Sequence, residues 1–292
     1  MRCWRCCGSV AELSVAVASP DDLRAIARRR EYDDAGFRIA SEFADRGTVW
    51  AARDDGEVVG IAVMHASEDE RYVGELFVEP SYRSQGVGGK LLDAAFADAD
   101  DVGRAMLLDP NEPAGFALAM RRGIAPTDSI VRFAGAIPRE EELAKMAAGS
   151  YRFQVEPLDP LAHAFGIDAL DRLTRGTQRG GDQRFFTQFA TGHVFFLDGD
   201  LVAYAYVWPD GRIGPLACAA QAYLVQIFAY ALVTLQRRYQ ASWCTMLVPG
   251  ANVRIARAAL RAGLNIQQTL SLARDSRGGD ASTYVGYHVL LY

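Results

Sequence analysis

A short glycine-rich stretch has the composition of a loop that binds a phosphorylated ligand. It reads Arg83-Ser84-Gln85-Gly86-Val87-Gly88-Gly89. Pro80 predicts the end of the preceding strand, and the apolar pattern after Gly86 predicts a helix. The first amides of a helix have no acceptor within it, and its dipole adds partial positive charge there. Because glycines let an anion approach the backbone and Arg83 adds a full charge, we expect a pyrophosphate to bind here.

The elements that must position this loop occur twice in the 292 residues. Each half predicts a strand, a helical region, a hairpin, a central strand, a helix, a further strand and a helix that a glycine ends. The hairpin glycines Gly56 and Gly199 differ in number by 199 − 56 = 143. The helix-ending glycines Gly123 and Gly263 differ by 263 − 123 = 140. Two offsets that agree this closely indicate a duplicated domain.

Composition and punctuation predict the limits of the two copies. We expect a disordered extension at 1–11, a first domain at 12–138, a linker at 139–150 and a second domain at 151–292. Pro138, a run of charged residues and Gly149 make the linker polar, and it has room for a short helix.

The pattern Arg83-x-x-Gly86-x-Gly88, directly after Leu76-Phe77-Val78-x-Pro80, resembles the acetyl-CoA signature of the GNAT (GCN5-related N-acetyltransferase) superfamily. The resemblance implies an α/β fold with two tandem GNAT-like domains, each a mixed, mostly antiparallel sheet flanked by helices. It also implies that acetyl-CoA or another acyl-CoA is a co-substrate.

The same resemblance implies roles for individual residues. The backbone of Phe77 and Val78 is expected to pair with the pantetheine arm. Asn111 is similar to the family's asparagine that contacts the sulfur-proximal end of the donor, and a helix N-cap is its alternative role. The residues expected to hold the pyrophosphate are Arg83, Ser84, Gln85, Gly86, Val87, Gly88 and Gly89.

Glu75 is the candidate catalytic residue. It lies where family members often place a general base, which takes the proton of the amine nucleophile, commonly through water. A structural glutamate paired with an arginine is the alternative, and the sequence favours neither. Many family members keep a tyrosine acid four residues before the helix-ending glycine, but Ala119 and Ala259 occupy these positions here. Tyr82, a residue of the other half, or unassisted departure of the thiolate are the substitutes we consider.

The second half lacks the loop. After its central strand it reads Cys218-Ala219-Ala220-Gln221-Ala222-Tyr223, with no glycine and no basic residue. Side chains would crowd a phosphate there and no charge would attract it. We therefore expect a degenerate repeat that does not bind CoA in the usual way, and whose role is structural or is to shape the acceptor pocket of the first.

Charge and apolar patterning exclude other classes. The net charge of −5 and the absence of a dense basic patch argue against a nucleic-acid partner. The longest apolar stretch, 219–235, is too short to span a membrane. Three cysteines fall in the first seven residues and no second ligand pair accompanies them, so we expect a reducing cytoplasm and no metal.

These observations predict an enzyme that moves an acyl group, by default acetyl, from CoA to a primary amine of a small molecule by direct attack. An acyl-carrier-protein-bound donor and a non-catalytic CoA-binding or scaffold protein are the alternatives. Acceptor, acyl group and oligomeric state stay open.

Overall fold

The computed structural model describes residues 13–149, 151–179, 181–276 and 278–292. The predicted extension at 1–11, with Cys3, Cys6 and Cys7, lies outside the described residues. The contacts divide the chain into two units, which we call the first unit (Met1–Met64 and Glu75–Asp100) and the second unit (His65–Gly74 and Asp101–Tyr292).

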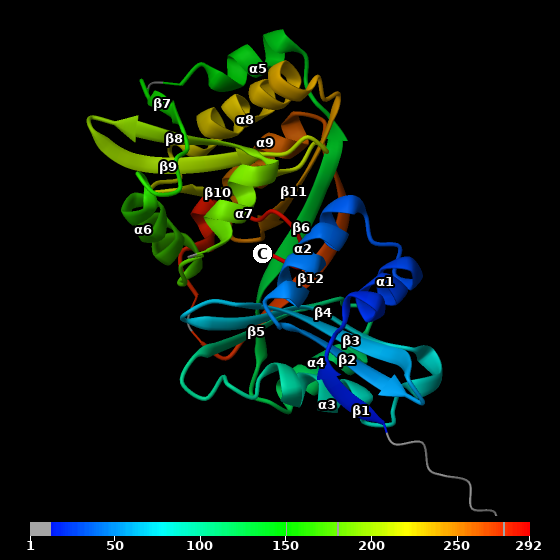
Figure 1. Ribbon diagram of the computed structural model, residues 1–292. Coiled ribbons are helices and arrows are strands. Elements are labelled where there is room, and N and C mark those ends of the chain that lie inside the picture. Colours follow the sequence, from blue (N-terminus) through cyan, green and yellow to red (C-terminus); the bar gives the residue numbers. More distant parts are fainter. Residues whose placement is uncertain (1–12, 150, 180, 277) are drawn as a thin grey trace, which may run out of the picture. The chain divides into compact units, whose positions relative to one another are not determined.

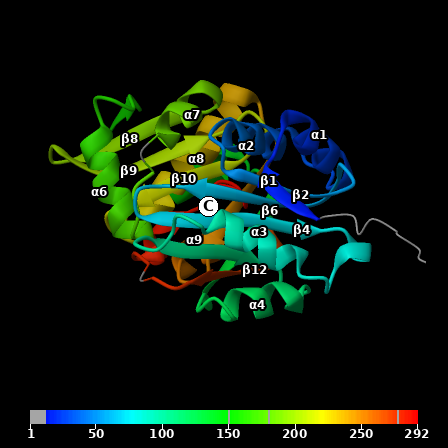
Figure 2. The same cartoon turned by 60° about the horizontal axis from the view of Figure 1, so that its bottom comes forward.

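In the first unit, β1, β2 and β3 pair antiparallel in this order, with helices on both faces (Figure 1). β3 is buried along nearly its whole length, as expected when both faces of a strand are covered. Figure 2 shows α1 and α2 again together beside β1 and β2. Its elements are β1 (Ser14–Val17), α1 (Pro20–Arg29), α2 (Asp34–Asp45), β2 (Val49–Asp54), β3 (Glu57–Ala66) and α3 (Val87–Ala95).

The start of α1 follows directly from its sequence. Ser19 accepts a hydrogen bond from the Asp22 amide, and Asp22 bonds back to the Ser19 amide at 2.6 Å, which completes a capping box. Pro20 occupies the first helical position, where its missing amide costs nothing. Asp22 is also paired with Arg53 of β2, so this cap ties the helix to the sheet.

β4 (Glu70–Val78) begins in the second unit and ends in the first. Its first residues pair in parallel with β5 (Gly103–Leu108), from Glu70 opposite Gly103 to Val73 opposite Met106. A 3₁₀ turn, η1 (Pro80–Tyr82), follows β4 and leads to α3, as the proline predicted.

The second unit contains two groups of paired strands, in the orders β4-β5-β12-β6-β11 and β13-β10-β9-β8-β7. Its helices are α4 (Pro113–Met120), α5 (Glu140–Ala147), α6 (Ala164–Arg175), α7 (Asp182–Phe189), α8 (Leu224–Tyr239), α9 (Val253–Arg261) and the 3₁₀ turn η2 (Ala281–Thr283). Its further strands are β6 (Ala125–Ala136), β7 (Gln154–Pro157), β8 (Thr191–Leu197), β9 (Asp200–Val207), β10 (Ile213–Cys218), β11 (Trp243–Pro249), β12 (Asn265–Arg274) and β13 (Tyr284–Val285).

The last strands of the two halves are exchanged. β12, from the second half, lies between β5 and β6, while β6, from the first half, pairs with β11. Leu108 of β5 faces Ser271, and Val248 of β11 faces Val131. Val248 is the counterpart of Leu108 and Ser271 is the counterpart of Val131, because the residue numbers differ by the same amount: 248 − 108 = 140 and 271 − 131 = 140. Each half thus contributes a strand that lies beside the fifth strand of the other half. Strand pairing therefore crosses the domain limits at 138 and 151, which stay a prediction.

The core of the second unit is built on α8. Leu224, Ile227, Phe228, Leu232 and Leu235 are all fully buried and recur at helical spacing. Each buried side chain of this size stabilises the fold by about 1.5–3 kcal/mol relative to an exposed one. The helix begins at Leu224, directly after a turn at residues 221–223.

No helix within the described ranges is long and apolar enough to cross a membrane. The same residues contain no group of three or more histidine, cysteine or acidic side chains that could hold a metal ion.

Candidate active site

The glycine loop lies between β4 and α3. Ser84 and Gly86 both have positive φ angles, 63° and 83°, so the chain turns sharply before the helix. A Cβ atom at Gly86 would meet nothing within 4 Å, which leaves the space above the helix N-terminus open. Gly86 is the N-cap of α3, and no side chain caps this end. The loop therefore presents helix amides at an open surface, the arrangement that binds phosphate oxygens.

Two further loop side chains turn back onto the protein. Gln85 donates to the Ser81 carbonyl at 2.8 Å, and Arg83 donates through Nε to the Val78 carbonyl at 3.2 Å. Both side chains are exposed. Val87 differs from its neighbours, because its side chain is 2% exposed and packs in the core. Only its amide is available to a ligand.

Gly60 of β3 lets the end of β4 approach closely. A Cβ atom at Gly60 would lie 2.9 Å from the Phe77 carbonyl oxygen and 3.1 Å from Leu91 of α3. The Glu79 amide donates to the Val59 carbonyl at 2.9 Å. Because successive residues of a strand direct their backbone groups to opposite edges, Phe77 faces β3 and Val78 faces away from it. Of the two predicted pairing positions, Val78 is the one with outward backbone groups.

Glu75 has two partners that the sequence did not indicate. Arg30 donates through Nε to one carboxylate oxygen at 2.8 Å, and the Tyr32 hydroxyl donates to the other. The Glu75 side chain is 12% exposed. Arg30 also lies over the Phe77 ring, 4.9 Å from its centroid. Glu75 is thus paired with an arginine, as the structural interpretation expected. The same contacts hold its carboxylate in place, which a general base would also require.

Tyr32 is kept protonated by its surroundings. Burial raises the pKa of its phenol well above the ordinary value, and the charge and hydrogen bond of Glu75 raise that pKa further. Tyr32 therefore stays a hydrogen-bond donor to Glu75 across the physiological pH range. No sequence signal links these two residues, which lie far apart in the chain and meet only in the fold.

Asn111 lies in the second unit, and its alternative role as a helix N-cap is wrong. Glu112 is the N-cap of α4, whereas the amide and side chain of Asn111 both donate to Asp109 at 2.9 Å. Asn111 is exposed. Ala119 is fully buried, so α4 offers no acid at the position of the family tyrosine. Tyr82, one of the substitutes considered, donates to Asp54 at 2.8 Å.

The second half keeps the strand register of the first but not its loop. Tyr72 pairs with Ala105, and Arg212 pairs in parallel with Thr245. Arg212 is the counterpart of Tyr72 and Thr245 is the counterpart of Ala105, since 212 − 72 = 140 and 245 − 105 = 140, the offset that also relates the exchanged strands. β10 and β11 are therefore the counterparts of β4 and β5. Beyond this pair β10 takes a different neighbour, β13.

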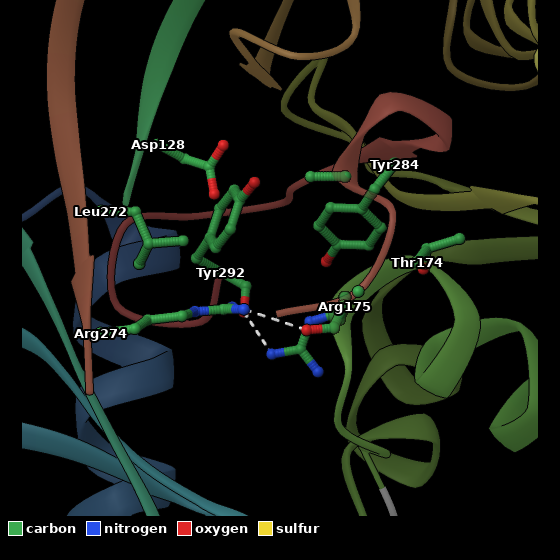
Figure 3. A pocket seen from close by; sticks show the side chains of 9 residues that line it. Asp128, Thr174, Arg175, Leu272, Arg274, Tyr284 and Tyr292 are labelled. Carbon is green, nitrogen blue, oxygen red and sulfur yellow. Dashed lines mark hydrogen bonds between the residues drawn. The ribbon is translucent and has the colours of Figure 1, made fainter. Parts of the chain in front are cut away.

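A small pocket of the second unit is lined by buried charges (Figure 3). Arg175 donates to the Tyr292 carbonyl at 2.7 Å, and Arg274 donates to the Arg175 carbonyl at 3.0 Å. Arg274 also pairs with Glu70 at 3.5 Å. Opposite charges and carbonyl oxygens compensate these arginines, as burial requires.

Comparison with known proteins agrees with this architecture. Residues 45–118 match the family of acetyltransferase (GNAT) domains. A mycothiol acetyltransferase from Paenarthrobacter aurescens (strain TC1) is 31% identical over an alignment of 191 residues, which covers 59% of this chain and 56% of that protein. The match thus spans little more than half of that relative's length.

Solved structures share the fold along almost the whole chain. A proposed acetyltransferase from Pyrococcus horikoshii superposes with a TM-score of 0.70 at 14% identity, covering 96% of both chains. A tandem GNAT protein from the clavulanic acid biosynthesis pathway superposes with a TM-score of 0.60 at 17% identity, covering 90% of this chain and 98% of its own. Residues 45–118 therefore match a GNAT domain, and the chain as a whole shares its fold with a tandem GNAT protein.

Proposed function

We propose that this protein transfers an acyl group, by default acetyl, from acyl-CoA to a primary amine of a small molecule. The observation that carries the proposal is the open, uncapped N-terminus of α3 at Gly86, directly after β4, in the part of the chain that matches the family. Helix amides and Arg83 would hold the pyrophosphate, together with the other residues of the loop.

The outward backbone groups of β4 suit the rest of the donor. Val78 faces away from β3, and the pantetheine arm is an extended chain with two amide groups. In the second half, the counterpart of this edge pairs with an extended piece of backbone. An edge of this kind satisfies its hydrogen bonds by adding a strand-like ligand. The contact of Asn111 with the sulfur-proximal end stays a prediction from the sequence resemblance.

Glu75 would act as the general base. The amine nitrogen attacks the thioester carbonyl and forms the C–N bond, while the carbonyl oxygen takes the negative charge. The outward Val78 amide can donate to that oxyanion. When the intermediate collapses, the C–S bond breaks and the thiolate leaves, and the proton of the attacking amine passes to Glu75 directly or through water.

The leaving group needs no dedicated acid in this scheme. A thiol has a pKa of about 8.5, so its thiolate is a stable leaving group near neutral pH. This accounts for Ala119 at the position of the family tyrosine. A cytoplasmic location, where acyl-CoA is made and used, is part of the proposal.

Isothermal titration with acetyl-CoA tests the donor site. We expect micromolar binding that Gly86→Glu abolishes, because the new carboxylate would occupy the phosphate position. Gly263→Glu is the matched control, since Gly263 has nearly the same φ angle, 84° against 83°, and equally open space. It should bind acetyl-CoA normally.

The same preparations then separate the alternatives. Release of free CoA on addition of amines supports the transferase. Binding of acetyl-CoA without transfer to any of a broad amine panel would favour the non-catalytic protein. Failure to bind acetyl-CoA, with transfer from an acetylated carrier protein, would favour the carrier-bound donor.

A further inference from the structure

The space between β10 and β11 is filled by a piece of the same chain, which we call the inserted segment (Tyr284–Gly286). Val285 and Tyr284 pair antiparallel with Leu216 and Ala217 of β10. On the other side, the Gly286 amide donates to the Leu247 carbonyl of β11 at 2.7 Å. The inserted segment is thus a strand between two strands.

The two strands are in contact before the segment and part to admit it. Arg212 and Thr245 form a parallel bridge, and the Thr245 amide donates to the Gly211 carbonyl at 3.0 Å. Further along β10, Leu216 no longer faces β11 but faces the inserted segment. By the constant offset between the repeats, Leu216 to Cys218 correspond to Leu76 to Val78, the edge that we assign to the pantetheine arm.

Close packing at Gly214 fixes the segment in this groove. A Cβ atom at Gly214 would overlap the Gly286 carbonyl oxygen, so a glycine is required for the backbone to come this near. Gly74, the counterpart of Gly214 in β4, allows an equally close approach by the chain after the inserted segment. A Cβ atom at Gly74 would lie 2.6 Å from Leu290 Cα. The Tyr72 hydroxyl also donates to the Val289 carbonyl.

The groove binds the segment with side chains as well as strand edges. Asn252, fully buried at the start of α9, caps that helix by accepting from the Ile255 amide and donates through Nδ2 to the Tyr284 carbonyl at 2.9 Å. Arg179 donates to the Tyr284 hydroxyl. Just beyond the segment, the Tyr287 ring stacks on Trp208 at a centroid distance of 3.8 Å.

We propose that the second repeat has kept its strand groove as a binding site for an extended peptide, with the inserted segment of its own chain as the permanent ligand. Backbone amides replace those of a pantetheine arm, and neither glycine nor arginine is needed because no phosphate is bound. Each chain therefore has one acyl-CoA site. The identity of the first groove rests on the proposed function, whereas the occupancy of the second does not.

Hydrogen exchange of the full-length protein tests the occupancy directly. We expect slow exchange of the Val285 and Gly286 amides in the free protein, with no acceleration when acetyl-CoA is added at saturation. Fast exchange in the free protein, or acceleration on adding acetyl-CoA, would show that the segment is not a permanent ligand and would overturn the proposal.

A pair of glycine variants tests the groove. Gly214→Ala places a methyl group against the Gly286 carbonyl, so we expect exchange of the segment to rise by about tenfold or more. Gly199→Ala is the control: its φ angle of 93° imposes comparable backbone strain, but nothing lies within 4 Å. Equal exchange in both variants would sink the idea that Gly214 seats the segment.

Titration with acetyl-CoA supplies the second readout. One equivalent per chain, abolished by Gly86→Glu, is expected. Two equivalents, or one that survives Gly86→Glu, would overturn the single-site conclusion. If no acetyl-CoA binds while the segment stays protected, the proposed donor site fails and the peptide groove stands.

Discussion

Ile130 and Leu270 lie directly opposite each other where β6 pairs with β12. Their numbers differ by 270 − 130 = 140, the same offset that relates the two halves of the chain. Each is therefore the counterpart of the other, and the approximate two-fold symmetry of the duplication passes between them. Both side chains are buried, Ile130 fully and Leu270 at 6% exposed. The exchanged strands consequently meet at a shared apolar pair.

Removing either member of this pair should destabilise the protein. Ile130→Ala and Leu270→Ala are each expected to lower the free energy of unfolding by about 2–4 kcal/mol, because each leaves a cavity in a packed core. The double variant should cost less than the sum, since the residues are direct cross-strand neighbours. Urea denaturation measures all three. Ile266→Ala, on the same strand and 54% exposed, should change stability by less than about 0.5 kcal/mol.

Arg83→Ala should weaken acetyl-CoA binding about tenfold, because a charge-assisted hydrogen bond to phosphate contributes about 1.5 kcal/mol or more. The loss should shrink as salt is raised, since Arg83 is exposed. Titration at two salt concentrations measures it. Pantetheine, which lacks the pyrophosphate, is the control ligand, and an equal loss for both ligands would contradict a phosphate contact.

Glu75→Gln separates the base from the structural partner. Glutamine keeps an acceptor for Arg30 and Tyr32 but cannot take a proton, so we expect kcat to fall by about 10²–10³-fold with unchanged acetyl-CoA affinity. Glu79→Gln is the matched control, because Glu79 lies just beyond the end of β4 and pairs with Arg29 at 2.9 Å. Retained activity in Glu75→Gln would assign Glu75 a structural role.

Tyr32→Phe tests whether Glu75 must be held. Loss of the hydroxyl frees one carboxylate oxygen while Arg30 still holds the other. We expect a fall in kcat of about tenfold, the effect of a lost hydrogen bond to a charged group, with an unchanged KM for acetyl-CoA. A change in stability without any fall in kcat would argue against a positioning role.

Asp171 should make stability depend on pH. Burial raises the pKa of this carboxyl to about 6, although Arg179, Arg175 and a hydrogen bond from Tyr204 oppose the rise. The folded state then binds more protons than the unfolded state between about pH 4 and 6, so its contribution to stability falls by about 3 kcal/mol as pH rises through that window.

Comparison with Asp171→Asn isolates this contribution. Urea denaturation of both proteins at pH 4.5 and pH 7 gives the difference in unfolding free energy at each pH. The unfolding free energy of the wild type, relative to that of the variant, should be higher at pH 4.5 than at pH 7. A difference that is the same at both values would show that Asp171 does not titrate in this range.

Features that depend on neighbouring residues were predictable from the sequence. Gly86 and Gly263 have the positive φ angles expected of a loop glycine and a helix-ending glycine. Ser19 caps α1 and Pro20 occupies its first helical position, a local pattern of the kind that sequence encodes. The duplication was also visible, because hairpins and helix ends repeat their glycines at nearly constant spacing. The second repeat lacks the loop, as its sequence indicated.

Pairings between distant residues were not predictable in this way. Strand exchange leaves the apolar pattern of β6 and β12 unchanged, since each strand meets an equivalent neighbour in either half. Arg30 and Tyr32 reach Glu75 only in the folded chain. The alternative role of Asn111 as a helix N-cap was wrong because α4 begins one residue later, with Glu112 as its N-cap.

The sequence by itself indicated the duplication and the glycine loop before α3, because these depend on local conformation and on residues within a few positions of one another. Tertiary structure alone decided which half each final strand completes and what fills the second groove. Those outcomes depend on the free energy of packing surfaces that lie far apart along the chain, and two equivalent strands offer the same surface to either partner. The inserted segment contains no recognisable sequence motif. Its role follows only from its pairing with β10 in the folded protein.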